Sequence, residues 1–197
     1  DIRDLTWEYL PKKKIYSRFL KFFMDLSIKK SKKILVSNQA EFKYVKNLNS
    51  NVISMSNGIS INKFNELSMI PSYDSQPINV TYIGNIGVAQ NLKVLLNVAS
   101  ERPKVIFNIV GNGTQYNELK NYAKKLQLEN IKFYGQLPWA EVLKIYGKTS
   151  VLYAQLSDDY TTAFPSKLYE YLSTGLPIIY GGKGYAIEIL KKFENVI

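Results

Sequence analysis

The sequence contains no cysteine and no histidine among its 197 residues. Without cysteine, the chain can form neither disulfides nor thiolate metal sites, which agrees with a reducing compartment. Without histidine, it has no Ser-His-Asp triad, no His-Glu-x-x-His zinc site and no imidazole general base. These two absences remove most hydrolase and metalloenzyme classes.

Long apolar runs are also missing. No stretch could span a bilayer and no charged-then-apolar leader is present, so nothing in the sequence indicates a secreted or integral membrane protein. The balance of 46% hydrophobic and 21% charged residues is that of a globular protein with a buried core. Because the chain begins with Asp1 and ends in what reads as a strand just begun, we expect a fragment of a longer protein.

Short β-rich runs alternate with helical patterns from Ile78 onward. Strands are predicted at 78–83, 105–110, 131–134, 151–154 and 177–180. Helical spacing between them is shown by two sets of residues, Leu92, Leu95, Leu96 and Ala99, and Trp139, Val142, Leu143 and Tyr146. This alternation predicts an α/β fold, a Rossmann-like, doubly wound parallel sheet covered on both faces. Such sheets bind ligands at the carboxyl ends of their strands, so the loops at 84–87, 111–113, 135–138 and 155–165 should share one edge.

A second, smaller unit is predicted upstream. Residues 33–37 read as a strand, 39–46 as a helix and 52–54 as another strand, which together resemble the tail of an N-terminal α/β domain. Asn57-Gly58, Pro71 and serine-rich sequence interrupt the periodicity between 58 and 76. We therefore expect residues 1–66 to be the end of an N-terminal domain with its linker, and residues 67–197 to be a C-terminal domain truncated at its C-terminus.

The stretch from Phe164 to Ile179 carries the strongest functional signal. Pro165 suits the first turn of a helix, Ser166 can cap it, and Gly175 can end it in a left-handed conformation. Amides at such an N-terminus, together with Lys167, form a receptor for a diphosphate. Glu170, one turn further, can accept hydrogen bonds from two neighbouring sugar hydroxyls. The combination predicts a nucleotide-sugar site; the alternative is an ordinary i, i+3 ion pair between Lys167 and Glu170 on a solvated helix face.

This stretch resembles the donor-site helix of GT-B glycosyltransferases, in the large retaining family called group 1 or family 4. Three further segments match in the expected order, namely Asp1 to Leu5, Asn57-Gly58-Ile59 with Phe64, and Val80 to Gly87. The motif Pro-Ser-Lys-x-x-Glu-Tyr-Leu-x-x-Gly-x-Pro is similar to that of the subgroup that builds bacterial O-antigen, capsule and exopolysaccharide chains, often from N-acetylated amino sugars. The resemblance implies the C-terminal donor domain of a GT-B fold.

The resemblance also implies an activity and roles for residues. It implies a hexosyltransferase-type enzyme that moves a sugar, with retention, from a uridine diphosphate donor to a lipid-linked surface glycan, without cofactor or metal. Glu170 would hold the ribose, Lys167 and Ser166 the diphosphate, and Thr162 would occupy the place of a first glutamate that many relatives carry. Donor contacts are further implied for a larger set: Gly84, Asn85, Gly87, Gly135, Gln136, Leu137, Phe164 and Pro165.

One departure from the family pattern has an electrostatic consequence. Many relatives carry a basic pair that neutralises the donor diphosphate, whereas the matching positions here are Asn85 and Gln90-Asn91. A leaving diphosphate develops negative charge, and loss of a preorganised partner for such charge costs on the order of 3 kcal/mol. We therefore expect Lys167 to supply the compensating cation. Taken alone, Gly84 to Gly87 and Gly111 to Gly113 indicate tight turns more than a ligand site.

The formal charge of +10 is concentrated near the N-terminus. Between residues 11 and 33 there are nine basic residues and one acid, and Ile15, Phe19, Phe22, Phe23 and Leu26 fall on one helical face. A basic amphipathic helix of this kind can adsorb to an anionic membrane at the cytoplasmic face, where a lipid-linked acceptor would lie. It can equally pack on its own domain with its lysines in water. Nucleic acid is a weaker alternative because the aromatic residues lie on the apolar face.

Two other classes of function remain open. A nucleotide-sugar epimerase could share the two-domain architecture, and a non-catalytic nucleotide-sugar or membrane-binding module could share the site. We expect a cytoplasmic protein, peripheral on the membrane if the basic helix adsorbs. We also expect the fragment to bind donor weakly and to transfer nothing by itself.

Overall fold

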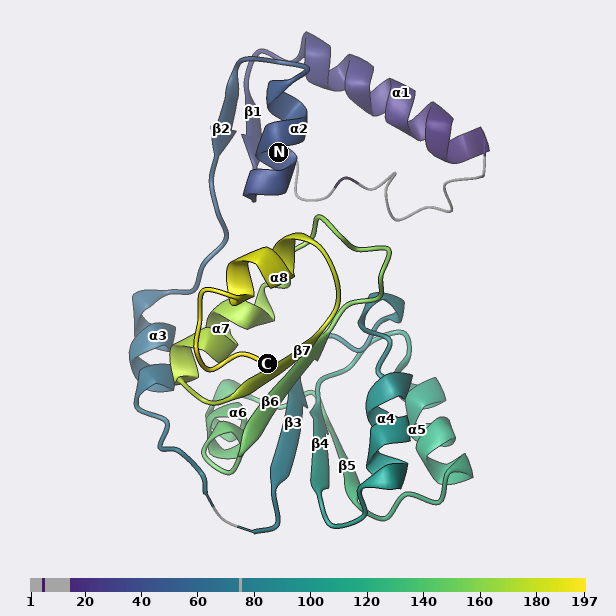
Figure 1. The fold of residues 1–197 in the computed structure, drawn as a ribbon, viewed down its shortest axis with the longest axis vertical. Coiled ribbons are helices and arrows are strands. Elements are labelled where there is room, and N and C mark those ends of the chain that lie inside the picture. Colours follow the sequence, from purple (N-terminus) through teal and green to yellow (C-terminus); the bar gives the residue numbers. More distant parts are fainter. Residues whose placement is uncertain (1–4, 6–14, 75) are drawn as a thin grey trace.

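The computed structural model describes residue 5, residues 15–74 and residues 76–197. Its larger part is built on a five-stranded parallel sheet in the order β5-β4-β3-β6-β7 (Figure 1). The strands are β3 (Asn79–Ile83), β4 (Ile106–Val110), β5 (Ile131–Gly135), β6 (Val151–Gln155) and β7 (Ile178–Gly181). The predicted Rossmann-like α/β fold is therefore confirmed, and each predicted strand is present within one or two residues of its expected bounds.

Helices cover both faces of this sheet (Figure 1). α4 (Lys93–Glu101) and α5 (Tyr116–Lys125) pack on one face, while α6 (Trp139–Tyr146) and α7 (Lys167–Thr174) pack on the other, joined by α8 (Tyr185–Leu190). The core under α4 and α5 contains Tyr82, Leu96 and Ile109. The core under α6 and α7 contains Tyr146, Leu168 and Tyr171, and all six side chains are essentially inaccessible to solvent. Both helical repeats predicted from the sequence thus face the sheet.

The smaller N-terminal unit also has the predicted elements. It consists of α1 (Ile15–Lys30), β1 (Ile34–Val36), α2 (Gln39–Lys46) and β2 (Val52–Ser54), with β1 and β2 paired in parallel. Asn38 caps α2 by accepting a hydrogen bond from the Glu41 amide, 2.9 Å away, and Glu41 completes a capping box. Ile28, Ile34, Val36 and Val45 form its buried core together with Leu5.

The apolar face of α1 that the sequence analysis identified is exposed. Ile15, Phe19, Phe22 and Phe23 are between 59% and 73% accessible, and Leu26 is 38% accessible. The helix packs on its own unit through a different stripe, with Ile28 buried and Leu20 and Met24 partly buried. Lys12, Lys13 and Lys14, which belong to the predicted basic segment, lie outside the described residues.

The helix α3 (Ile61–Ser68) was not predicted. It lies in the segment interpreted as a linker, begins at Ser60, whose hydroxyl accepts from the Lys63 amide, and lies beside α7 (Figure 1). Leu67 is its single fully buried residue and joins the core that contains Leu168 and Tyr171. Ile61, Phe64 and Leu67 do recur at helical spacing, but Asn57-Gly58 and Pro71 on either side favour a linker.

The loops that follow β3, β4 and β5 continue the hydrogen-bond ladder of the sheet. The Gly84 amide donates to Val110 O at 2.9 Å, and the Gly111 amide donates to Gly135 O at 2.7 Å. One step further, the Ile86 amide donates to Asn112 O at 2.9 Å. The glycine loops therefore lie side by side at the carboxyl edge of the sheet, as the sequence analysis predicted.

The close approach of these loops predicts a specific cost for a methyl group at Gly111. This residue has φ 128°, and an added Cβ would collide with the carbonyl oxygen of Gly84. We expect Gly111→Ala to lower the free energy of unfolding by roughly 3 kcal/mol, measured by chemical denaturation. Gly175→Ala is the control, because Gly175 has φ 69° with open space around it, and it should cost only about 1 kcal/mol. Equal losses in the two variants would contradict the role of the loop contact.

Candidate functional site

A cavity of about 520 Å³ opens at the carboxyl edge of the sheet. Seven of the residues that the sequence singled out line it: Gly84, Asn85, Phe164, Pro165, Ser166, Lys167 and Glu170. They come from the loop after β3 and from the first turns of α7 with the loop before it. The structure therefore brings the predicted helix terminus, its lysine and its glutamate to one cavity.

The position of the cavity follows from the way β3 and β6 separate. Their pairing extends only from Val80↔Val151 to Thr81↔Leu152, which leaves the backbone of Ile83 without a strand partner on that side. The hydroxyl of Tyr171 takes this place, accepting from the Ile83 amide at 2.7 Å and donating to the Ile83 carbonyl at 3.1 Å. Burial raises the pKa of Tyr171 well above its usual value, so the hydroxyl keeps the proton that it donates. The bond fixes α7 with its first turn at the cavity.

The first turn of α7 is only partly what the sequence predicted. Ser166 is the residue before the helix, but its side chain makes no capping hydrogen bond, so the predicted cap is wrong. The amides of Ser166 and Lys167 have no hydrogen-bond partner within the described residues, and both residues line the cavity. Gly175 ends the helix in the left-handed conformation, as predicted. Free amides at a helix N-terminus are the groups that bind anions in proteins.

Lys167 is partly buried beneath the glycine loop. Its Nζ donates to the hydroxyl of Tyr82 and lies 3.8 Å from the centroid of that ring, while the Tyr82 hydroxyl donates to Asn85 O. Burial lowers the pKa of Lys167 from its usual 10.5 to about 7, and the nearby Glu170 carboxylate opposes part of this shift. Because its contacts are aromatic rather than anionic, the ammonium would gain from an anion in the cavity.

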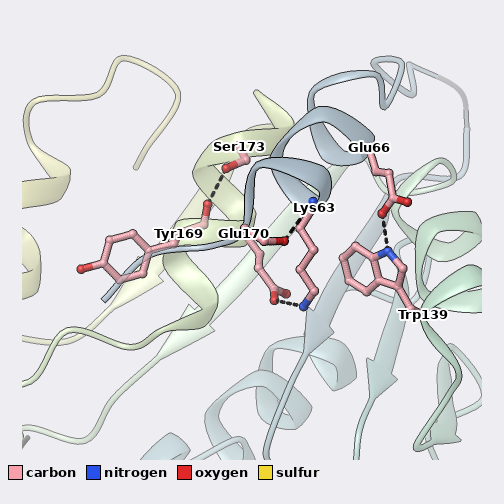
Figure 2. A network of polar contacts seen from close by, with 7 residues as sticks. Lys63, Glu66, Trp139, Tyr169, Glu170 and Ser173 are labelled. Carbon is pink, nitrogen blue, oxygen red and sulfur yellow. Dashed lines mark hydrogen bonds and ion pairs between the residues drawn. The ribbon is translucent and has the colours of Figure 1, made fainter. Parts of the chain in front are cut away.

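Glu170 forms an ion pair with a residue that the sequence analysis did not identify. Figure 2 shows Lys63, from α3, reaching Glu170, with its Nζ 2.8 Å from Oε1. Lys167 and Glu170 do not pair with each other in the structure, so the alternative of an ordinary i, i+3 ion pair is wrong. No local pattern could have revealed the Lys63 contact, because the two residues are 107 positions apart.

The other predicted donor-site residues lie close by but not in this cavity. Gln136 and Leu137 line a second cavity of about 320 Å³, which shares Ile83, Gly84 and Asn85 with the first. Gly135 supports that edge by accepting from the Gly111 amide. Gly87 lines a separate cavity of about 120 Å³, and Thr162 lines neither the first nor the second cavity, although its neighbours Ala163 and Phe164 line the first. The roles given to these residues stay predictions.

The cavity also contains residues that sequence reasoning missed. These are Ser37 and Asn38 from the smaller unit, with Ala89 and Tyr169 from the larger one. Asn57, identified only as part of the linker motif, and Leu156 and Tyr160, from the predicted edge loop at 155–165, also line the cavity. Ser37 and Asn38 directly follow β1, and Asn57 follows β2, so the same carboxyl-edge rule could have found them. The cavity thus lies where the two parts of the chain meet.

In residues 15–74 and 76–197, no three acidic side chains cluster in a way that could hold a metal ion. In the same part of the chain, no helix is both long enough and apolar enough to cross a bilayer.

A five-stranded parallel sheet with a cavity at its carboxyl edge, where the strand order reverses, defines a Rossmann-like α/β domain. Residues 65–197 match the family described as glycosyl transferases group 1, and the chain belongs to this family. No sequence among the curated proteins matches this one.

Solved structures share the fold at low sequence identity. The structure of Anabaena HepE with UDP and glucose is 16% identical, with a TM-score of 0.68 over 92% of this chain and 52% of that one. A TarM mutant of S. aureus, bound to Fondaparinux, alpha-GlcNAc-glycerol and UDP, is 14% identical, with a TM-score of 0.61 over 88% of this chain and 35% of that one. WaaG, a glycosyltransferase involved in lipopolysaccharide biosynthesis, is 12% identical, with a TM-score of 0.66 over 91% of this chain and 52% of that one.

The chain therefore spans about half the length of HepE and WaaG and about a third of TarM.

The lowered pKa of Lys167 predicts how the free energy of unfolding changes with pH. Its pKa is about 7 in the folded protein and near 10.5 in the unfolded chain, so the unfolded state binds more protons between these values. The free energy of unfolding should therefore rise with pH in this window, by less than about 1 kcal/mol per pH unit because the side chain is partly solvated.

Lys167→Met should lose this rise between pH 7 and 9, the range below tyrosine ionisation, when unfolding is followed by urea denaturation at each pH. If wild type and variant showed parallel pH profiles, Lys167 would be ordinarily solvated and the account of its environment would be wrong.

Proposed function

We propose that this chain binds the donor of a retaining glycosyltransferase that takes its sugar from uridine diphosphate. The carrying observation is that Lys167, the free amides at the start of α7 and Glu170 all line one cavity at the carboxyl edge of the sheet. A diphosphate needs fixed amides and a cation, and a ribose needs a hydrogen-bond acceptor a few ångströms away. Membership of the glycosyl transferases group 1 family agrees with this chemistry.

In this proposal, the diphosphate lies against Ser166 and Lys167, beside Gly84 and Asn85. Lys167 is the cation that offsets the charge that develops on the leaving diphosphate, because Asn85 and Gln90 are neutral. Donor binding would raise the lowered pKa of Lys167, since an anion stabilises the ammonium form. Glu170 accepts hydrogen bonds from the ribose.

The base and the sugar are assigned to the two flanks of this site. The uracil occupies the second cavity, at Gln136 and Leu137, because that cavity shares Gly84 and Asn85 with the first. The transferred sugar lies near Phe164 and the adjoining Thr162. HepE has been solved with UDP and glucose, and TarM with UDP and alpha-GlcNAc-glycerol, which supports a uridine nucleotide and a hexosyl or N-acetylhexosaminyl group.

The basic helix α1 supports a proposal for the acceptor and its location. We assign a lipid-linked bacterial surface glycan of the O-antigen or capsule type as acceptor and the cytoplasmic membrane face as the place of reaction. The exposed apolar face of α1, flanked by lysines, supports adsorption to an anionic leaflet. WaaG acts in lipopolysaccharide biosynthesis, which agrees with a surface-glycan product. The proposed transfer uses no metal, with Lys167 and the helix amides in its place.

Calorimetric titration of this chain with UDP tests the donor site. We expect UDP to bind, and Glu170→Ala and Lys167→Ala each to weaken it by about ten- to a hundredfold, because each removes charge-assisted hydrogen bonds to the ligand. Glu118→Ala is the matched control: Glu118 also pairs with a lysine, Lys93, but lies on α5, outside the two cavities of the proposed site. Absence of UDP binding at millimolar concentration, or equal affinity in wild type and both site variants, would refute the proposal.

A further inference from the structure

We infer that Lys63 is a positioning residue of the donor site, which holds one oxygen of Glu170 so that the other is presented to the ribose. The inference rests on the proposed function, because it concerns how Glu170 receives the nucleotide. Lys63 does not line the cavity, so it acts through Glu170 rather than on the ligand.

Lys63 is itself fixed from two directions. Its ammonium lies 2.8 Å from Glu170 Oε1 and 4.4 Å from the centroid of the Trp139 ring (Figure 2). The indole of Trp139 is held in turn, because its Nε1 donates to Glu66 Oε2 at 2.5 Å. Glu66 and Lys63 both belong to α3, so one helix supplies the lysine and also the acceptor that orients the ring beneath it. An ammonium between a carboxylate and an aromatic face has two attractive partners.

The two helices that carry the pair are packed against each other. Leu67 of α3 is fully buried in the same core as Leu168 and Tyr171 of α7. Tyr171 is bonded to the end of β3. The ion pair is therefore made between two rigid elements, and it does not depend on a mobile loop.

The second oxygen of Glu170 is available. Within the described residues, Oε2 has no hydrogen-bond partner, and the side chain is 23% exposed and lines the cavity. A carboxylate can accept about four hydrogen bonds, so one ammonium leaves room for two hydroxyls. A carboxylate that is already oriented loses less conformational freedom when the ligand binds.

The two lysines of the site therefore have different tasks. Lys167 contacts the Tyr82 ring and forms no ion pair with a carboxylate among the described residues, so it can bind an anionic ligand. Lys63, in contrast, is paired with Glu170. If Lys63 merely competed with the ribose for Glu170, its removal would strengthen binding. If it positions Glu170, its removal must weaken the recognition of ribose in particular.

Comparison of UDP with 2′-deoxy-UDP isolates the ribose contact. The ratio of their dissociation constants, measured by calorimetry on this chain, cancels the general effect of a lost positive charge on an anionic ligand. We expect UDP to bind wild type about tenfold more tightly than 2′-deoxy-UDP. Lys63→Met and Lys63→Gln should reduce this ratio to about two or less, while Lys63→Arg should retain most of it.

Lys93→Met is the matched control. Lys93 pairs with Glu118 and lies 5.7 Å from the Tyr122 ring, so it repeats the same three-part arrangement away from the site. Because Lys93 lies outside the two cavities assigned to the nucleotide, this variant should keep the ratio. Thermal unfolding of each variant checks that the fold is retained; Lys63 is 42% exposed, so its replacement leaves the core intact.

The outcomes separate the inference from the proposed function. A ratio that is unchanged or increased in both Lys63→Met and Lys63→Gln would overturn the positioning role while leaving UDP binding intact. A wild-type ratio near one, or a ratio that survives Glu170→Ala, would instead show that Glu170 does not hold the ribose, and the inference would fail together with that part of the proposed function.

Discussion

The site depends on one buried hydroxyl. Where β3 and β6 separate after Thr81↔Leu152, the amide and carbonyl of Ile83 would remain unpaired inside the protein, and a buried unpaired backbone group costs about 1–3 kcal/mol. Tyr171 satisfies both groups with a single oxygen. Because Tyr171 lies in the second turn of α7, this local requirement of the sheet also places the helix and aims its first turn at the gap. The hydrogen bonds of Tyr171 thus link the strand separation to the position of the site.

The positive charge in the cavity does not come from the glycine loop. That loop contributes neutral Asn85 to the cavity lining. Lys167 supplies the charge from the helix side, over the Tyr82 ring and beneath Gly84, in a partly desolvated position. Desolvation disfavours the charged form of Lys167 and would strengthen its attraction to an anion, since Coulomb attraction is stronger where water is excluded. Aromatic support keeps the lysine in place without neutralising it.

Much of this arrangement could be predicted from the sequence, because parallel sheets in α/β proteins leave regular signals. Buried strands are continuous β-rich runs, and α4 and α6 showed their apolar repeats, so the sheet edge and its loops followed from topology. Three features could not be predicted: a short helix between turn-forming residues, a contact between residues distant in sequence, and the side-chain contacts of a helix cap. The helix α3 has only Leu67 fully buried, and the Lys63–Glu170 ion pair joins residues 107 positions apart. Ser166 is a residue type that often caps helices, but its side chain makes no capping hydrogen bond here.

The missed helix changes how the two parts of the chain are understood. The sequence analysis assigned the segment after Gly58 to a linker, yet α3 packs into the core of the larger part through Leu67 and holds Glu170 through Lys63. The connection between the parts is therefore shorter and lies between β2 and Ser60, where Met55 is 63% exposed and the Met55 amide makes the last backbone bond to β1, at Val36 O. The smaller unit adds Ser37, Asn38 and Asn57 to the cavity across this short connection. Because α3 lies on the larger part's side of this connection, the Glu170 contacts among the described residues all come from the larger part, and they do not require the smaller unit to be in any one position.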